Sequence, residues 1–104
     1  MARVYISGPI SGYDIEERRT EFARVEKILE LEGHEVHNPL GAGWEPGHKT
    51  EYYMRRDLAM LLAADSIFMM RRWKHSAGCK LEFDVAVSID LEVRFEEVTN
   101  VKFE

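Results

Sequence analysis

Residues 3–12 read Arg3-Val4-Tyr5-Ile6-Ser7-Gly8-Pro9-Ile10-Ser11-Gly12. The residues up to Ser7 predict a short strand, and Gly8-Pro9 ends it because glycine and proline interrupt regular structure. The glycines let backbone N–H groups approach an anion at the start of the next helix. This loop matches neither the dinucleotide fingerprint nor the Walker loop, since its glycine spacing differs and no Gly-Lys-Ser/Thr follows. Its importance therefore depends on what the rest of the chain places around it.

Helical and strand patterns alternate along the rest of the chain. The expected strands are residues 3–7, 35–37, 66–70, 91–95 and, at a sheet edge or simply as a tail, 98–103. The expected helices begin after the N-cap residues Asp14, Thr50 and Ser76, and the second carries the apolar stripe Met54, Leu58, Leu61 and Leu62. This order of elements predicts a parallel sheet covered by helices. Residues 66–70 are nearly all apolar, which is typical of a central strand buried on both faces.

Composition limits the classes of function. A chain of 104 residues predicts one domain, 1–104, and its 45% hydrophobic residues are ordinary for a soluble protein. No apolar run approaches the about 20 residues of a membrane helix, and we see no signal-peptide pattern. Cys79 is the single cysteine, so the expected compartment is the reducing cytoplasm. The net charge of −5 disfavours long nucleic acid, which needs a basic face, but allows a small nucleotide.

Glu82 is the first candidate for chemistry. It shares one helical face with Val85, Ala86 and Ile89, and that face is otherwise apolar. One interpretation places Glu82 at the edge of the stripe, where its carboxylate reaches solvent. The other holds the carboxylate at the mouth of a pocket, where enzymes keep nucleophiles and general acids.

Two aspartates precede the expected central strand at residues 66–70. Asp57 lies beside the apolar stripe of the second expected helix, and Asp65 follows directly before the strand. Asp65 on its own favours a turn or cap residue, because aspartate often binds local backbone N–H groups.

Two loops are candidate binding segments. In an open sheet of order 2-1-3-4, the loops that leave the first and third strands flank the site where ligands bind. The second of these, residues 71–76, offers cations, Trp73 for stacking a base, and the helix N-terminus at Ser76; a solvated charge run is the alternative. The long loop at 38–49 carries Trp44 and predicts a lid.

The remaining polar residues predict no metal or cofactor. The four histidines form no metal motif, and zinc is not expected. Cys79 lies in the first turn of a helix with no evident base, so we interpret it as a packing residue.

Taken in order, these motifs resemble the nucleoside 2-deoxyribosyltransferase superfamily over roughly residues 3–92. The motifs are the strand and loop from Val4 to Ile10, Asn38-Pro39, the pair Asp57 and Asp65, and Ser76-x-Gly78-x-x-x-Glu82. The chain is most similar to a short, often phage- or prophage-borne branch. The resemblance implies a flavodoxin-like three-layer α/β/α fold with a parallel four- to five-stranded sheet of order 2-1-3-4(-5).

The resemblance also implies roles for individual residues. Glu82 would attack the anomeric carbon, Asp57 would serve the leaving base, and Tyr5 would orient Glu82. The implied substrate-binding residues are Ser7, Gly8, Pro9, Ile10, Ser11, Gly12, Asp65, Trp73, Ser76 and Gly78. Ser76 matches the related deoxynucleoside 5′-monophosphate N-hydrolases, whose serine contacts phosphate. Those hydrolases carry an arginine where this chain has Ser11, so Arg71, Arg72 or Lys74 would have to compensate.

Two functions follow from these residues. The first is an enzyme that cleaves or transfers at the N-glycosidic bond of a nucleoside or nucleotide, without cofactor. The second is a module of the same fold that binds or sequesters a nucleotide without catalysis. Retained Tyr5, Asp57 and Glu82 favour the enzyme, since a sensor has no need of a nucleophile. The shared sites of the resembled family further predict a homodimer or higher homo-oligomer.

Overall fold

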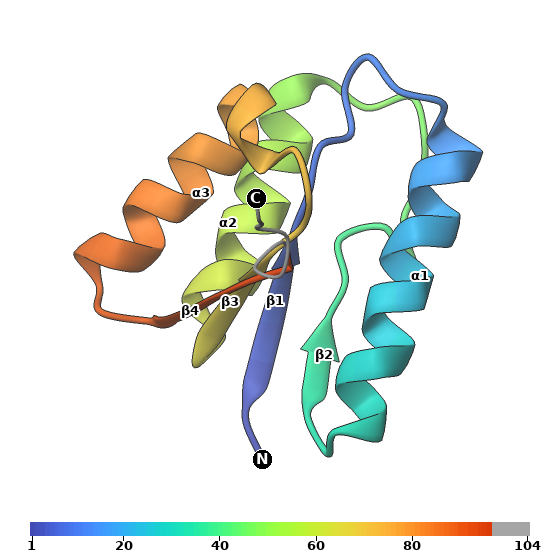
Figure 1. Cartoon of the computed structure of the whole chain (residues 1–104). Helices are drawn as coiled ribbons and strands as arrows, with labels where there is room; N and C mark the ends of the chain where they lie inside the picture. Colours follow the sequence, from blue (N-terminus) through green and yellow to red (C-terminus); the bar gives the residue numbers. More distant parts are fainter. Residues whose placement is uncertain (97–104) are drawn as a thin grey trace, which may run out of the picture.

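The computed structural model describes residues 1–96 and contains a four-stranded, all-parallel sheet of order β2-β1-β3-β4 (Figure 1). Its strands are β1 (Arg3–Ser7), β2 (Glu35–His37), β3 (Ser66–Met69) and β4 (Glu92–Phe95). The two interior strands β1 and β3 pair from Val4 to Ser7 of β1, and β3, the strand predicted to be central, is buried along its whole length. The predicted parallel sheet, its order and its buried central strand are therefore confirmed. The edge strand or tail at 98–103 lies outside the described residues.

Three α-helices cover the sheet, namely α1 (Ile15–Leu31), α2 (Thr50–Leu62) and α3 (Ala77–Ser88). A short 3-10 turn, η1 (Trp73–His75), precedes α3. Helix α1 covers one face of the sheet, and α2 and α3 lie side by side on the other (Figure 1). Among residues 1–96, no helix is both long and apolar enough to span a membrane.

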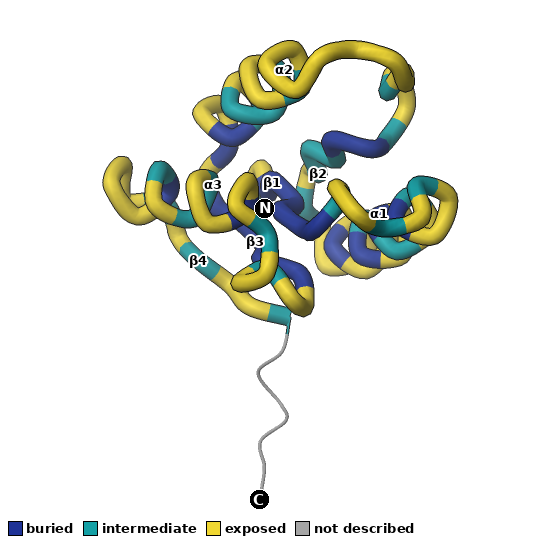
Figure 2. Tube along the Cα trace, turned by 90° about the horizontal axis from the view of Figure 1, so that it is seen from above, coloured by how far each residue is buried: buried dark blue, intermediate teal, exposed yellow. Residues whose placement is uncertain are grey.

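Alternation along the strands builds two cores. Val4 and Ile6 of β1 face α1 and pack with Phe22 and Leu29. Tyr5 faces the opposite way, into the core under α2 and α3. The buried residues lie along the strands and the inner sides of the helices, whereas the outer turns are exposed (Figure 2).

Two of the three predicted helix caps are confirmed. Asp14 accepts a hydrogen bond from the backbone N–H of Glu17, and Ser76 accepts one from that of Cys79. The predicted cap at Thr50 is wrong, because Thr50 is already helical and Lys49 precedes it without a side-chain cap.

The predicted stripe of α2 is only partly correct. Leu61 is fully buried, but Leu62 is 60% exposed and Met54 is 41% exposed. Ile89, predicted to share the buried face of α3, is likewise exposed and lies just past the end of the helix. Helical spacing shows that a helix has an apolar face, but it does not show whether that face packs against the sheet, lines a cavity or is exposed.

Gly8 is required where β1 leaves the sheet, because its backbone packs directly against two side chains. A Cβ atom there would lie 2.6 Å from Met70 Sδ and 3.0 Å from Phe22 Cζ. By contrast, a Cβ atom on Gly78 would meet only Ser76 Oγ, at 3.9 Å.

We therefore expect Gly8→Ala to destabilise the fold by about 1–3 kcal/mol, the usual cost of overpacking a core. Gly78→Ala is the matched control, and its stability should not fall, because alanine is the better helix former. Urea denaturation of both variants measures the two effects. Equal stability of Gly8→Ala and the wild-type protein would contradict the close packing described for this loop.

Candidate active site

Two hydroxyl groups of β1 hold the carboxylate of Glu82. Tyr5 Oη donates to Glu82 Oε2 at 2.8 Å, and Ser7 Oγ donates to Oε1 at 2.6 Å. Tyr5 and Ser7 are two residues apart on one strand, so both side chains point toward α3. Glu82 therefore has a fixed position at the carboxyl end of the central strand, where open parallel sheets bind ligands.

Burial and hydrogen bonding have opposite effects on the pKa of Glu82. Desolvation raises the pKa of Glu82 above its ordinary value, while the hydrogen bonds from Ser7 and Tyr5 oppose that rise. The pKa of Tyr5 lies well above its ordinary value, because the ring is buried and negative charge on Glu82 lies nearby. Tyr5 therefore stays protonated and remains a donor to the carboxylate.

Asp57 of α2 is the second carboxyl group of the site. Burial, and then the charge of Glu82, raise the pKa of Asp57 to about 7, although Arg56 acts in the opposite direction. The Asp57 side chain is only 16% exposed, and Arg56 Nη1 lies 3.5 Å from its Oδ1. Asp57 is therefore close to half protonated at neutral pH, so it can both give and take a proton.

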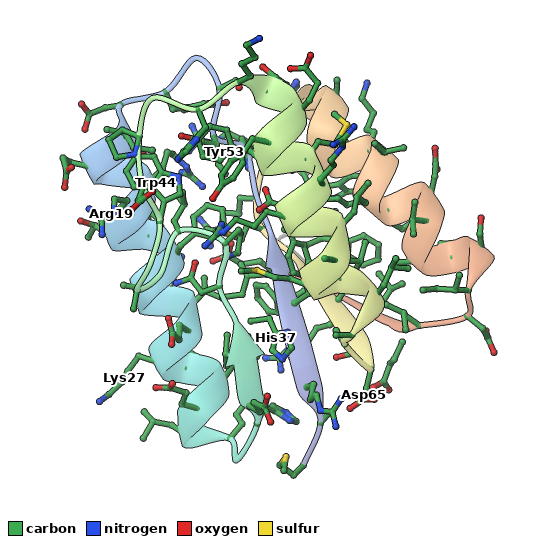
Figure 3. All side chains as sticks on the ribbon, turned by 180° about the vertical axis from the view of Figure 1, so that it is seen from behind. Arg19, Lys27, His37, Trp44, Tyr53 and Asp65 are labelled. Carbon is green, nitrogen blue, oxygen red and sulfur yellow. The ribbon has the colours of Figure 1, made fainter. Side chains whose placement is uncertain are left out.

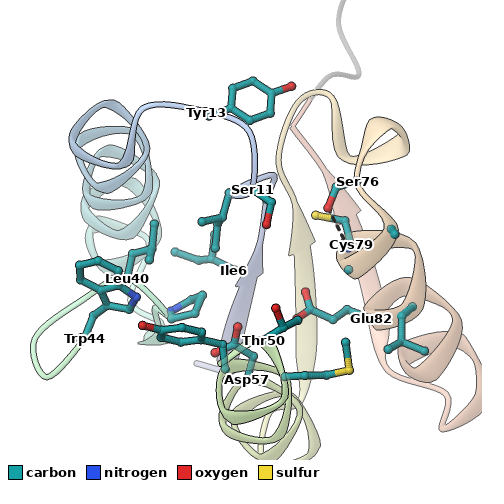
Figure 4. Close-up of a pocket in the computed structure, with 18 of the residues that line it drawn as sticks. Ile6, Ser11, Tyr13, Leu40, Trp44, Thr50, Asp57, Ser76, Cys79 and Glu82 are labelled. Carbon is teal, nitrogen blue, oxygen red and sulfur yellow. Dashed lines mark hydrogen bonds between the residues drawn. The ribbon is translucent and has the colours of Figure 1, made fainter. Parts of the chain in front are cut away.

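A cavity of about 740 Å³ opens over both carboxyl groups (Figure 4). One wall is apolar and aromatic, and it includes Leu40, Trp44, Tyr53 and Met54. The other wall contains the first loop and the start of α3. The predicted substrate-binding residues that line the cavity are Gly8, Ile10, Ser11, Ser76 and Gly78.

The loop at 38–49 forms part of the apolar wall and is attached to both neighbouring helices. Arg56 Nη1 donates to the carbonyl of Pro39 at 2.9 Å, and Tyr53 Oη donates to that of Glu45 at 2.6 Å. The Trp44 ring stacks on Tyr53, and the guanidinium of Arg19 in α1 lies 5.3 Å from the centre of the Trp44 ring (Figure 3). Trp44 thus lines the cavity, and its role in a lid stays a prediction.

Two predicted binding residues lie elsewhere. Asp65 stands at the amino end of β3, opposite the cavity, and its carboxylate accepts a hydrogen bond from the backbone N–H of Arg3 at 2.9 Å. Asp65 therefore has a structural role instead of a binding one, but its partner is the start of β1, 62 positions away, and not the local backbone that the capping interpretation assumed. Trp73 packs against Phe83 and Phe95, with ring centres 4.9 and 5.7 Å apart, instead of facing the cavity.

Three further predicted residues are close to the cavity without lining it. Pro9 is buried, and its carbonyl accepts a hydrogen bond from Arg18. Gly12 forms the turn of the loop, with φ of +86°. Ser7 contacts Glu82 and not the open cavity, so its position fits a positioning residue.

Sequence reasoning missed much of the cavity wall. Tyr13, Leu40, His48 and Tyr53 all line the cavity, but no motif singles them out. The role of Ser7 had a readable signal, because a residue two positions from Tyr5 on a strand must face the same way. Cys79 is buried in the core under α3, in agreement with its interpretation as a packing residue. Among residues 1–96, no group of three or more acidic, histidine or cysteine side chains is placed to hold a metal.

Comparison with known proteins supports the fold and places the chain in a family. The chain belongs to the family described as "Domain of unknown function (DUF4406)", whose profile matches residues 2–95. A 2-deoxyribosyltransferase from the psychrotolerant bacterium Bacillus psychrosaccharolyticus has a similar structure, with a TM-score of 0.69 at 19% identity. The match covers 95% of this chain and 77% of that one. No curated protein matches the chain.

This likeness confirms the predicted flavodoxin-like fold of the nucleoside 2-deoxyribosyltransferases. At 19% identity it shows the fold alone. The phage-borne branch and the relation to the N-hydrolases stay predictions.

The raised pKa of Asp57 predicts a pH-dependent cost to stability. The folded protein holds this proton up to about pH 7, whereas an ordinary Asp loses it near pH 3.8, so the wild-type protein loses stability as pH rises between those values. Asp57→Asn stays neutral, so its stability should exceed that of the wild type above pH 7, by about 2 kcal/mol or more. The two should converge near pH 4. Denaturant titrations from pH 4 to 8 measure the difference, with exposed Asp84→Asn as the control. A constant difference at every pH would show that Asp57 does not titrate as described.

Proposed function

We propose that the protein cleaves or transfers at the N-glycosidic bond of a nucleoside or nucleoside 5′-monophosphate. The observation that carries the proposal is the carboxylate of Glu82, which two hydroxyl groups fix at the floor of a cavity. The same cavity holds a second carboxyl group, Asp57, whose pKa is raised to about 7. Two carboxyl groups in different environments suit glycosidic chemistry, because one can attack while the other protonates.

Glu82 is the proposed nucleophile. One carboxylate oxygen forms a bond to the anomeric carbon as the bond from that carbon to the base nitrogen breaks, and the electron pair of the broken bond leaves with the base. The hydrogen bonds from Tyr5 and Ser7 position the carboxylate for this attack. They also favour its ionised form against the effect of burial, and only the ionised form is nucleophilic.

Asp57 is the proposed general acid. Its pKa of about 7 leaves a proton available at neutral pH, and this proton neutralises the negative charge that develops on the departing base. The resulting Asp57 carboxylate then takes a proton from the acceptor. The acceptor, water in hydrolysis or a second base in transfer, displaces Glu82 from the anomeric carbon. The structurally similar protein is a 2-deoxyribosyltransferase, and this likeness supports the proposed class of reaction.

The aromatic wall formed by Trp44 and Tyr53 is the proposed contact surface for a base, because planar rings stack favourably. Ser11, Ser76 and Gly78 line the opposite side and offer polar groups to the sugar.

Homo-oligomerisation is a further prediction. Leu62 at the end of α2 and Ile89 just past the end of α3 are 60% and 44% exposed, and they are candidate contacts for such an interface. Sedimentation velocity at micromolar concentration should show a dimer or larger species. A monomer at every concentration would contradict this prediction.

The central test of the proposed function is release of free base from deoxynucleosides and their 5′-monophosphates by the purified protein. Glu82→Gln keeps the size of the side chain but removes the nucleophile, so base release should fall on the order of a thousandfold or more. Exposed Glu92→Gln controls for the loss of one carboxylate. Chromatography of the released base measures both. Ligand binding without base release by the wild-type protein would instead favour the non-catalytic nucleotide-binding module.

A further inference from the structure

A second pocket, of about 350 Å³, lies between α1 and the ends of β3 and β4, and it shares no lining residue with the cavity above Glu82. Three arginines line it, namely Arg18, Arg71 and Arg72. This is a concentration of positive charge in a chain whose net charge is −5. The arrangement of these guanidinium groups is unusual in three respects.

The first is the burial of Arg18. This residue is 2% exposed, although arginine is rarely buried without a close partner. Its Nε donates to the carbonyl of Pro9 at 2.8 Å, and its Nη1 lies 3.4 Å from Glu17 Oε2. The Glu17 side chain is half exposed, so it compensates the buried charge weakly.

The second is the backbone of Arg72. Its φ is +66°, a left-handed conformation that costs an L residue roughly 1–2 kcal/mol. In this conformation the Arg72 guanidinium lies 5.1 Å from the centre of the Tyr13 ring. The Arg18 guanidinium lies 5.5 Å from the centre of the same ring. Two positive charges therefore converge on one side chain. Strain of this kind in a non-glycine residue points to a functional constraint.

The third is that Arg24 is the ion-pair partner of both carboxylates in the pocket, whereas Arg18 and Arg71 lower the pKa of Glu21 less than the hydrogen bond from Arg24 does. Glu21 and Glu96, the two acidic residues of the pocket, both bind Arg24, at 2.9 and 2.7 Å. Glu96 also accepts a hydrogen bond from the backbone N–H of Arg71. Within residues 1–96, none of the ion pairs involves the side chain of Arg71 or Arg72.

We infer that this pocket binds a phosphoryl dianion through the guanidinium groups of Arg18, Arg71 and Arg72. Guanidinium groups form strong, charge-assisted hydrogen bonds with phosphate oxygens, and a bound dianion would offset the mutual repulsion of the three cations. Tyr13, which lines the main cavity (Figure 4), also lies against both Arg18 and Arg72, so one side chain links the pocket to that cavity. The phosphoryl group belongs either to a nucleotide in the main cavity or to a separate anion that acts as an effector.

Calorimetric titration with inorganic phosphate, at an ionic strength matched with chloride, tests the site on the intact protein. The wild-type protein should bind phosphate, and Arg72→Gly should weaken binding by about tenfold or more, the usual effect of losing one hydrogen bond between charged groups. The melting temperature of Arg72→Gly should not fall, because glycine adopts the left-handed conformation freely. Lys74→Gln removes a cation from the same segment but outside the pocket, so its phosphate affinity should be unchanged.

No phosphate-specific binding by the wild-type protein would overturn the proposal, as would equal weakening in Arg72→Gly and Lys74→Gln. A second titration separates the two sources of the phosphoryl group. If a nucleoside 5′-monophosphate displaces phosphate and the unphosphorylated nucleoside does not, the phosphoryl group belongs to the nucleotide. If the protein binds phosphate and the monophosphate at the same time, the arginine pocket is the site of a separate effector. These measurements follow binding only, so they stand whether or not the proposed base release is found.

Discussion

The hydrogen bonds from Tyr5 and Ser7 to Glu82 join the first strand of the fold to its last described helix. Tyr5 and Ser7 lie 77 and 75 positions from Glu82 in the chain. Their contact requires that β1 lie inside the sheet, that β3 pair beside it and that α3 return over the same face. Two hydroxyl donors satisfy a carboxylate that burial would otherwise destabilise. The Glu82 carboxylate is therefore held by neutral donors and not by a salt bridge, which suits the nucleophile proposed above.

The second consequence of burying Glu82 is electrostatic. Burial of Asp57, and then the charge of Glu82, raise the pKa of Asp57 to about 7, so the two carboxyl groups are driven toward different protonation states. In the proposed reaction, that difference lets one group attack while the other donates a proton. It also costs stability at neutral pH, which is the usual relation between an active site and its fold. In the proposed function, Trp44, Tyr53 and the first loop, which line the same cavity, would contact the base and the sugar.

Much of the fold could be predicted because it depends on local patterns. Apolar periodicity located each helix, and the alternation of strands and helices predicted the parallel sheet. Glu82 and Asp57 could be singled out as carboxylates beside apolar stripes. Asp65 and Trp73 were predicted to bind substrate, but they do not line the cavity. They lie just before and just after β3, and such positions suit a ligand site and structural packing equally well. Only the three-dimensional structure puts Asp65 at the amino end of β3 and Trp73 against Phe83.

The central claim is that Glu82 becomes covalently attached to the sugar, and mass spectrometry of a trapped intermediate tests it most directly. A 2-fluoro-substituted nucleoside suits this test, because fluorine disfavours positive charge at the anomeric carbon and slows breakdown of a glycosyl ester. After incubation with the protein, the account predicts that the peptide containing Glu82 gains the mass of the fluorinated sugar. An adduct on a different peptide, or release of base with no adduct on Glu82, would contradict it.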